Sequence, residues 1–596
     1  MSLTPCPPLA KVAFVLALLI SVTSATSSLN TTQTGYNCTS QQSCWPSDEG
    51  WSKFNNSLSG NLHITIPLAA SCYYDSPYHN SSACAVAEEN YIGNQARTEV
   101  YGAATGLNWE SCLSETCALN IDTLQTLSSQ CYLGRLSSLY VDASKVQHVV
   151  TAVKFAKMHN LRVTIKNTGH DYLGRSTSPD SLAIWTHNLK NMTYHANFTA
   201  SNCTASNGHN IGEIGAGAQA SDIYTFFQKH GMDVTGGNEG SVGLAGGFGM
   251  GGGHGVFGPS YGLMVDNAVE FDVVTADGQL RSINQCNDPD LFWAMRGGGG
   301  GTFGVLTSYR FQLHPAVKIN AYSFRANFTT KGNETTNYPA LEQVLTKHAT
   351  YQPVWSHNNI SGHAYYWPNQ AEIYLVLPSN NETALKALTS DFSSFLTNNP
   401  DIQVTESNYT TYPTYTDFLQ LTESIAARLT PGGVFEALST RLIPRTLFET
   451  NSTIADLVNA TIQGIRISNE IVPDGGSFTQ LIMTTPVNVQ NGNTTSANPA
   501  WRSALWHLIM TGGWTEKLSA SKEKALQESW LDTVEPLKRL TPGGGCYLNE
   551  CSYLEPEWQS TYFGANYPEL VRVKDKYDPT HFFDCWKCIG WEGPSE

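Results

Sequence analysis

The sequence predicts an α+β protein with two lobes, one of which is unusually rich in glycine. A strand–helix–strand pattern over residues 138–165 indicates an α/β unit. Glycine makes up half or more of residues 236–255, whereas from 316 to about 535 its density falls and strands alternate with helices. Because a domain typically holds about 100–200 residues, a chain of 596 residues is expected to form two to four domains or lobes.

The α/β unit begins with a short strand at residues 138–142. Residues 143–160 follow as an amphipathic helix, because valines and alanines recur there at helical spacing, and Ser144 is a candidate N-cap. Residues 161–165 form a second strand with three consecutive β-branched side chains. A strand, a helix and a strand of these lengths are typical of a βαβ unit.

The second strand leads directly into the loop Lys166-Asn167-Thr168-Gly169-His170. Glycine at this point allows a sharp turn and a close approach of the backbone to a ligand. The loop offers backbone N–H groups, two small polar side chains and a cation, which together suit a phosphate-bearing cofactor. His170 at the loop tip is a candidate base, ligand or nucleophile, and an exposed histidine on a turn is the alternative interpretation.

Two later glycine stretches, 236–255 and 296–304, predict close contact between the backbone and a ligand. They follow a glycine-bearing strand or turn at 212–217 and a helix at 221–231. Glycine costs roughly 0.5–1 kcal/mol relative to alanine in a regular element, so such runs are kept where the backbone approaches phosphates or a flat ring. A linker is disfavoured, because apolar residues interrupt the glycines and strands flank them.

A dinucleotide site of the Rossmann type is disfavoured. Such a site requires G-x-G-x-x-G between a strand and a helix. Gly215-Ala-Gly217 lacks the third glycine, and Gly247-Phe-Gly249 lies inside a longer run with no helix expected directly after it. We therefore exclude NAD(P) as the main cofactor.

Charge and targeting signals indicate a secreted protein. A formal net charge of -16 with only 14% charged residues argues against nucleic acid and anionic membranes as partners. Lys11, an apolar run and a small-residue site near Ala25 are typical of a secretory signal peptide, and no later stretch reaches 18 apolar residues. About fifteen Asn-x-Ser/Thr sequons predict N-linked glycans, among them Asn30, Asn80, Asn191, Asn327, Asn381 and Asn493.

The cysteines predict disulfides at both ends of the chain. Cys6 leaves with the signal peptide, eight cysteines lie from Cys38 to Cys203, Cys286 follows alone, and four lie in the last stretch. The thirteen that remain are an odd number, so at least one thiol is expected to be free or paired elsewhere. Cys585 and Cys588 have the spacing of a metal or redox pair, but no second pair accompanies them, and we expect no metal site.

Several motifs resemble one family of flavoproteins. In the glycine-rich lobe they are similar to the vanillyl-alcohol-oxidase, or PCMH-type, FAD-binding domain, and in the tail to the C-terminal segment of berberine-bridge-enzyme-like oxidases. The closest branch contains secreted fungal members such as isoamyl alcohol oxidase, and the resemblance covers about 130–315 and 540–585. The motifs are 166–170, 243–247, 251–255, Tyr261-Gly-Leu, Asp266-Asn267, 290–304, Tyr547-Leu-Asn549, Trp558-Gln559, 562–567 and 573–579.

The resemblance implies an FAD lobe of two α/β subdomains and an α+β substrate lobe over the isoalloxazine ring, with a final segment that returns to the FAD lobe. We expect these parts in the order signal peptide, Cys-rich N-terminal extension, PCMH-type FAD-binding domain, substrate domain and berberine-bridge-like C-terminal segment. Their predicted bounds are 1–25, 26–129, 130–315, 316–540 and 541–596.

The resemblance also implies how the flavin is attached. His170 matches the histidine that bonds covalently to the flavin 8α-methyl group. Many members add a second link through a cysteine shortly before the Val-Gly pair of the glycine run, but Glu239 stands at that place here. We therefore expect FAD to be held by one covalent link, with Glu239 facing the ring or lying in a solvated loop. Val242 matches a gate position at which valine accompanies access of O₂, which favours an oxidase.

Two further residues are implied in catalysis. Tyr547 belongs to the Tyr-x-Asn motif that lies near the ring in this family. His254 stands near the end of the glycine run as a candidate base, with support of the glycine loop as the alternative, and Asn549 and Glu550 are lesser candidates. The expected cofactor-binding residues are Lys166, Asn167, Thr168, Gly169, His170, Gly174, Glu239, Gly240, Ser241, Gly243, Gly247, Gly253, Gly255, Asn566 and Tyr567.

These features predict a secreted, monomeric FAD-dependent oxidase. It would transfer a hydride from an alcohol, sugar or aromatic small-molecule donor to the flavin and then to O₂, giving H₂O₂. A tailoring oxidoreductase that cyclises or dehydrogenates a secondary metabolite shares every flavin motif. A secreted protein that binds flavin or carbohydrate without turnover is the alternative from another class.

Overall fold

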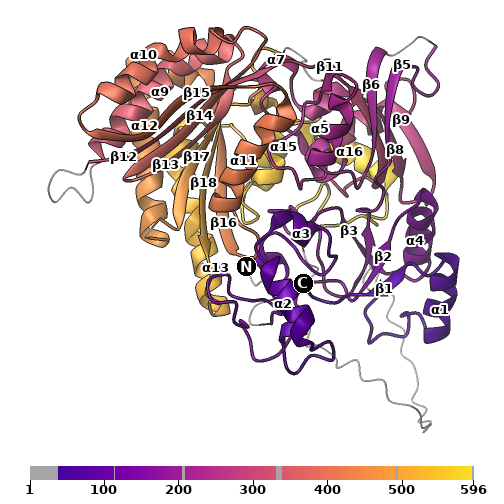
Figure 1. Cartoon of the computed structure of the whole chain (residues 1–596). Helices are drawn as coiled ribbons and strands as arrows, with labels where there is room; N and C mark the ends of the chain where they lie inside the picture. The colour runs from indigo at the N-terminus through magenta and orange to yellow at the C-terminus, as the bar shows by residue number, and fades with distance from the viewer. Residues whose placement is uncertain are drawn as a thin grey trace.

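The computed structural model describes residues 38–112, 115–204, 208–329, 338–473, 475–489 and 494–593. The expected signal peptide, Asn30 and Asn493 lie outside these ranges. The chain forms two lobes, which stand side by side in Figure 1. One lobe carries residues from the N-terminal half, and the other carries a large sheet from the later part of the chain.

The first sheet of the N-terminal lobe has four strands in the order β1-β2-β4-β3. The predicted strand–helix–strand unit is present as β2 (Leu139–Asp142), α4 (Val146–Met158) and β3 (Arg162–Lys166). β2 and β3 are not neighbours, because β4 (Ser181–Trp185) pairs in parallel with both of them. Ser144 is not the N-cap: the cap position is Lys145, without a side-chain bond, so that expectation was wrong.

The second sheet of this lobe has the order β5-β6-β10-β8-β9 and is antiparallel. The glycine run 236–255 lies beside this sheet and is mostly buried. Its middle folds into two short helical turns, Leu244–Phe248 and α6 (Gly249–Gly251), so it is ordered backbone rather than a linker. The strands are β5 (Met192–Phe198), β6 (Gly208–Gly215), β8 (Ala268–Val274), β9 (Leu280–Asn284) and β10 (Val305–Gln312).

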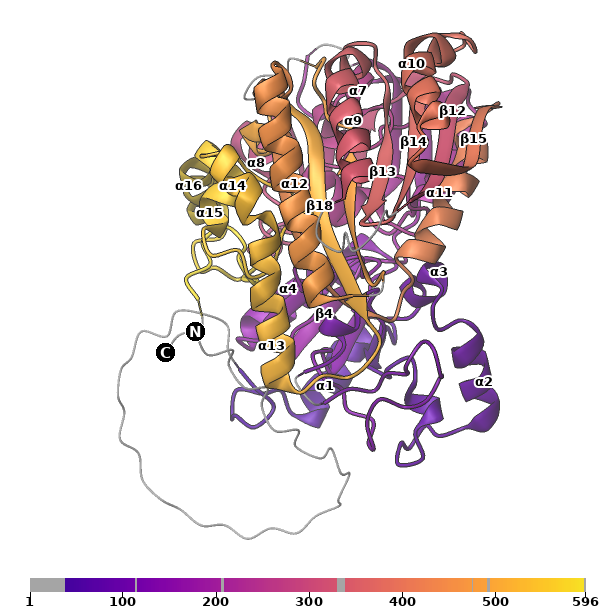
Figure 2. The ribbon, with the colours of Figure 1, turned by 90° about the vertical axis from the view of Figure 1, so that its left-hand side faces the viewer.

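The second lobe is built on a seven-stranded antiparallel sheet with the order β15-β12-β14-β13-β17-β18-β16. Helices α9 (Pro339–His357), α10 (Ala384–Asn398) and α12 (Asn451–Ile471) cover one face, as Figure 2 shows. Side chains of a strand alternate between the two faces, so the intervening residues face the other lobe. The strands are β12 (Ile319–Phe328), β13 (Ser361–Trp367), β14 (Gln370–Pro378), β15 (Ile402–Tyr412), β16 (Phe435–Pro444), β17 (Ser477–Ile482) and β18 (Ala504–Trp514).

The last segment of the chain returns to the first lobe, as predicted. Helix α16 (Tyr567–Tyr577) packs on α8 (Pro289–Met295). Lys574, fully buried, donates from Nζ to the Thr302 carbonyl at 2.6 Å and pairs with Asp578 at 2.8 Å. The fold is therefore the expected one, an FAD-binding lobe with a C-terminal return and an α+β second lobe.

The N-terminal part and the tail are held by disulfides. All cysteines of the described ranges, Cys112 included, are disulfide-bonded, so the expected free thiol is not found there. Cys585 and Cys588 pair with each other. The other described pairs are Cys38–Cys44, Cys72–Cys84, Cys117–Cys131, Cys203–Cys286 and Cys546–Cys551.

The N-terminal extension is integrated into the first lobe, since β1 (Leu62–Ile64) pairs with β2. No helix in the described ranges is both long and apolar enough to cross a lipid bilayer. The remaining elements are α1 (Asp48–Ser57), α2 (Ser81–Glu89), α3 (Asn94–Thr98), α5 (Ala220–Gln228), β7 (Met232–Asp233), α7 (Gly258–Tyr261), β11 (His314–Pro315), α11 (Tyr415–Leu429), α13 (Ala520–Ser529), α14 (Glu535–Leu540) and α15 (Trp558–Phe563).

Candidate active site

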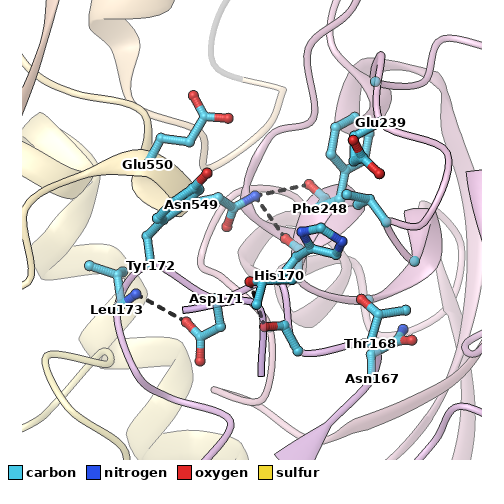
Figure 3. A pocket seen from close by; sticks show the side chains of 18 of the residues that line it. Asn167, Thr168, His170, Asp171, Tyr172, Leu173, Glu239, Phe248, Asn549 and Glu550 are labelled. Atoms are coloured by element: carbon cyan, nitrogen blue, oxygen red, sulfur yellow. Dashed lines mark hydrogen bonds between the residues drawn. The ribbon is translucent and has the colours of Figure 1, made fainter. Parts of the chain in front are cut away.

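A cavity of about 330 Å³ lies where the two lobes and the C-terminal segment meet. Its walls come from the loop after β3, the glycine run, the second glycine stretch, the inner face of the large sheet and the tail. Figure 3 shows His170 in this cavity, with Asn549 and Glu550 of the tail on one side and Glu239 and Phe248 of the glycine run on the other. The sequence motifs that lie far apart in the chain therefore converge on one space.

His170 is held by a short chain of hydrogen bonds. Its Nε2 lies 2.8 Å from Ser241 Oγ, and Ser241 Oγ donates to Glu239 Oε1 at 2.7 Å. Burial lowers the pKa of His170, while the Glu239 carboxylate opposes that shift. Gly169, with φ of 95°, makes the turn that brings His170 into the cavity. The imidazole is therefore neutral and fixed in orientation, and within the described chain Nδ1 has no hydrogen-bond partner.

Lys166 does not reach the cavity, which corrects its assignment as a cofactor-binding cation. Its side chain is fully buried, and Nζ donates to the carbonyls of Val100, Tyr101 and Ala103 in the N-terminal extension. Burial lowers its pKa to about 7. The reason is that the three carbonyls of the extension bind the ammonium group and hold the side chain away from the cavity.

The glycine run forms a wall that accepts a closely approaching group. A Cβ at Gly247 would meet no atom within 4 Å, because this backbone faces the cavity. At Gly243 and Gly246, a Cβ would lie 2.6 Å and 2.5 Å from the Asn167 amide, so a larger residue would displace that amide. Asn167 donates to the Ala216 carbonyl, and its Oδ1 is buried without a partner. Bare backbone beside an unpartnered amide oxygen fits a flat, phosphate-bearing cofactor such as FAD.

Seven other expected cofactor residues lie outside the cavity lining, and close packing explains the glycines among them. A Cβ added at Gly174 would lie 2.4 Å from the Trp109 ring. A Cβ added at Gly255 would lie 1.8 Å from the Gly236 carbonyl oxygen. Asn566 donates to the backbone carbonyls of Ser496 and Ala497, which makes it a structural residue. The seven are Gly174, Gly240, Ser241, Gly253, Gly255, Asn566 and Tyr567, of which Ser241 contacts His170; Thr168, Gly169, Gly243, Gly247 and Glu239 do line the cavity.

A cluster of two histidines and one carboxylate lies at the substrate side of the cavity. Glu550 accepts from His507 Nε2 at 2.7 Å, and its other oxygen lies 3.4 Å from His254 Nε2. The two histidines hold the pKa of Glu550 well below its usual range against the effect of burial. His254 Nδ1 lies 2.8 Å from Thr484 Oγ1, and His507 Nδ1 is buried without a partner. The cluster can accept a proton and retain it beside a negative charge.

Tyr547 and Val242 also line the cavity, as the resemblance implied. Tyr547 accepts hydrogen bonds from the Gly253 N–H at 3.1 Å and from Asn549 Nδ2 at 2.6 Å. Burial raises its pKa above the usual value, so the phenol stays protonated. Both bonds are donated to its oxygen, which leaves its proton available to a ligand.

Sequence motifs did not identify the residues of the large sheet that line the cavity. The inner face of this sheet contributes residues of five adjacent strands, β14, β13, β17, β18 and β16, with Tyr374 from β14. The alternation of side chains along a strand was the signal that could have identified them. Gln480 donates to His363 Nδ1 at 2.8 Å and lies 3.2 Å from the Tyr365 hydroxyl. Burial lowers the pKa of His363 to about 3, so it is neutral. The residues missed are Tyr172, His363, Tyr365, Glu436, Leu438, Phe478, Gln480, Ile482, His507, Ile509 and Thr511.

Two family models match this chain. One is an FAD binding domain at residues 137–284, and the other, described as berberine and berberine like, covers residues 546–589. Among curated proteins, FAD-linked oxidoreductase ZEB1 of Gibberella zeae is 31% identical over 559 residues, which are 93% of this chain and 92% of that protein. VAO-type flavoprotein oxidase VAO615 of Thermothelomyces thermophilus is 31% identical over 555 residues, 92% of each chain.

Solved structures agree with these relatives. The VAO-type flavoprotein MtVAO713 from Myceliophthora thermophila has a TM-score of 0.80 at 26% identity and covers 93% of this chain and 97% of its own. MtVAO615 from the same organism has a TM-score of 0.77 at 26% identity, with the same coverage. The fold and the cavity are those of an FAD-dependent oxidoreductase, and the chain belongs to the VAO-type, berberine-bridge-enzyme-like family of FAD-linked oxidoreductases.

Proposed function

We propose that the protein is a secreted oxidase that removes a hydride from a carbon bearing a hydroxyl group and delivers the electrons to O₂, with H₂O₂ as the second product. The observation that supports this most is that a glycine-walled cofactor site and the His254–Glu550–His507 cluster share one cavity. Bound FAD supplies the hydride acceptor. The protein must hold the donor carbon in place and take the hydroxyl proton.

His254 is the proposed base. Glu550 is ionised and lies 3.4 Å from His254 Nε2, so it stabilises the imidazolium that forms when the substrate hydroxyl loses its proton. His507 donates to the same carboxylate and fixes its position. Tyr547 keeps its proton and donates a hydrogen bond to the substrate oxygen.

His170 is proposed to carry the single covalent link to the flavin. Its Nε2 is engaged by Ser241, which leaves Nδ1 as the nitrogen for the bond. Glu239 occupies the place at which a second link would require cysteine, and its carboxylate bonds to Ser241 instead. Val242 lines the cavity at the gate position, which supports reoxidation by O₂.

Secretion, N-glycosylation and a monomeric state are part of the proposal. The many disulfides favour an oxidising compartment. Four of the expected glycan acceptors in the described ranges are exposed, namely Asn80, Asn191, Asn327 and Asn381. Culture-medium fractionation, enzymatic deglycosylation and light scattering test these three points.

A second candidate is oxidative tailoring of a secondary metabolite, which the fungal origin of the relatives favours. It uses the same flavin site, and product analysis separates it from simple alcohol oxidation. A protein that only binds flavin or carbohydrate would contain a flavin that dithionite reduces but that no organic donor reduces.

The test of the proposed function is the absorption spectrum of the purified protein before and after acid precipitation, followed by a screen for H₂O₂ release. We expect a yellow protein whose colour stays with the pellet in the wild type and is lost from the pellet in His170→Ala. A colourless protein refutes the flavin proposal, and a coloured protein that no donor reduces refutes the oxidase.

A further inference from the structure

Glu436 combines a rigidly held backbone with a carboxyl that has no protein partner. Asn108 Nδ2 donates to the Glu436 carbonyl at 2.8 Å, and the Glu436 N–H donates to Asn108 Oδ1 at 2.9 Å. Gln527 Nε2 donates to the same carbonyl at 2.9 Å. Within the described ranges, no hydrogen bond or ion pair joins the carboxyl itself, which lines the cavity. A partly buried carboxyl without a protein partner in the wall of a cavity is free to bind a ligand there.

The groups that face Glu436 do not neutralise it. A Cβ at Gly106 would lie 2.6 Å from Oε1, so the carboxyl lies directly against the N-terminal segment. Tyr172, from the loop after β3, is close enough for the Glu436 charge to raise the pKa of its phenol. Tyr553 of the tail lines a small adjoining space with Glu436. Because no cation lies beside it, removal from bulk water raises the pKa of Glu436 to about 7.

The charge at the substrate side of the cavity, where Glu436 and Glu550 lie, disfavours an anionic substrate. Carboxyl groups line the cavity from the loop after β3, the glycine run, the large sheet and the tail, whereas Arg175 is the one lysine or arginine in its described lining. The Arg175 guanidinium is occupied, because it donates to the carbonyls of Trp586 and Lys587 at 3.1 and 2.8 Å. The lining acids are Asp171, Glu239, Glu436, Glu550 and Asp584.

Apolar side chains surround Glu436 on the inner face of the large sheet. Leu438 follows it by two residues on β16 and pairs with Thr511 of β18, which in turn pairs with Phe478 of β17. Ile509 and Ile482 continue the same face. A substrate that fills this part of the cavity is therefore mostly apolar and meets Glu436 as an isolated polar group.

We propose that the Glu436 carboxyl, in its neutral form, binds a second polar group of the substrate, and that the substrate is an uncharged, largely apolar alcohol with a hydrogen-bond acceptor apart from the reacting hydroxyl. This inference rests on the proposed oxidase function. A neutral carboxyl donates its O–H to a carbonyl or ether oxygen, whereas the ionised form repels that oxygen and must lose its own hydration.

The pH dependence of binding follows from this assignment. With a pKa of about 7, the carboxyl is protonated in roughly nine-tenths of the molecules at pH 6 and in roughly one-tenth at pH 8. The apparent dissociation constant scales with the inverse of the competent fraction. Binding of a neutral acceptor-bearing alcohol is therefore expected to weaken about tenfold between these two pH values.

The test uses the holoprotein and three matched probes: methyl 4-(hydroxymethyl)benzoate, 4-(hydroxymethyl)benzoate and 4-(aminomethyl)benzyl alcohol. Dissociation constants are read anaerobically from the flavin spectrum and from protein fluorescence. We expect the neutral ester to bind at least about tenfold more tightly than the anion and to weaken with pH as calculated. The pH effect should disappear in Glu436→Gln, and Glu436→Leu should weaken ester binding at both pH values. Glu423→Gln, at a nearby carboxyl outside the lining, is the control and should match the wild type.

Three results overturn the proposal. One is ester binding that is independent of pH in the wild type and unchanged in Glu436→Leu. Another is tighter binding of 4-(aminomethyl)benzyl alcohol than of the ester, with the difference lost in Glu436→Gln. That result would mean that an ionised Glu436 carboxylate binds a cationic substrate. The third is Glu436→Gln protein that binds the ester normally but no longer transfers electrons to the flavin. Failure of the oxidase proposal is distinguishable, because then no donor reduces the wild-type flavin whatever the binding constants are.

Discussion

The hydrogen-bond chain from His170 through Ser241 to Glu239 is predicted to promote covalent attachment of the flavin. The two contacts measure 2.8 and 2.7 Å, and Glu239 is the only charged member next to a buried, neutral imidazole. A hydrogen bond to a charged group contributes about 1.5–3 kcal/mol, compared with about 1 kcal/mol for a neutral one. Glu239→Gln keeps the shape and removes the charge, so about 1–2 kcal/mol is lost, and attachment is expected to slow about 5- to 30-fold.

The assay follows covalent flavin in newly made protein by its fluorescence in acid-washed gel bands over time at fixed FAD concentration. Ser241→Ala breaks the chain and should slow attachment at least as much as Glu239→Gln, whereas His170→Ala should abolish it. Glu423→Gln is the matched control, because Glu423 lies against the same loop at Gly240 but has no bond to Ser241. The reasoning is refuted if Glu239→Gln and Ser241→Ala acquire covalent flavin at the wild-type rate, or if His170→Ala still acquires it.

Three further predictions concern catalysis, cofactor binding and stability. His254→Asn should retain flavin but lower the rate of flavin reduction by a donor about 10²- to 10⁴-fold, the usual contribution of a general base; a normal rate in stopped-flow measurements would exclude His254 as the base. Gly247→Ala should fold normally but bind less flavin, because its Cβ points into the cavity, whereas Gly513→Ala, in ordinary contact, should keep the wild-type ratio of 450 nm to 280 nm absorbance. Replacing Cys585 and Cys588 by serine should lower the free energy of unfolding by about 2 kcal/mol, as expected for so short a loop, and urea unfolding with an unchanged midpoint would contradict this.

Local sequence patterns predicted much of the first lobe. The strand at 138–142, the β-branched run before the loop and the helices at 143–160 and 221–231 all appear with bounds close to those expected. Each of these elements follows from the spacing of apolar residues within its own segment, and that spacing can be read from the sequence. The insertion of β4 between β2 and β3 was not predictable in this way, because strand order is decided by packing between distant segments.

The residues of the site were predicted correctly only where the conformation of the backbone requires a particular residue type. The glycines and His170 mark a backbone that must bend and approach a ligand, and that requirement is visible in the residue types alone. By contrast, Lys166 was assigned to the cofactor although its side chain points to the N-terminal extension. A strand alternates its side chains between two sides, and only the assembled fold shows which side borders the cavity.

By itself the sequence determined the class of cofactor site, the βα framework and the residue that is proposed to anchor the flavin. Tertiary structure alone decided which polar side chains meet. His254, His507 and Glu550 come from the glycine run, the large sheet and the tail, and Glu436 is held by Asn108 and Gln527, far away in the chain. Each of these residues is unremarkable among its sequence neighbours. Their protonation states and roles arise from burial and from distances of about 3 Å across the fold, since desolvation and nearby charges are what shift a pKa.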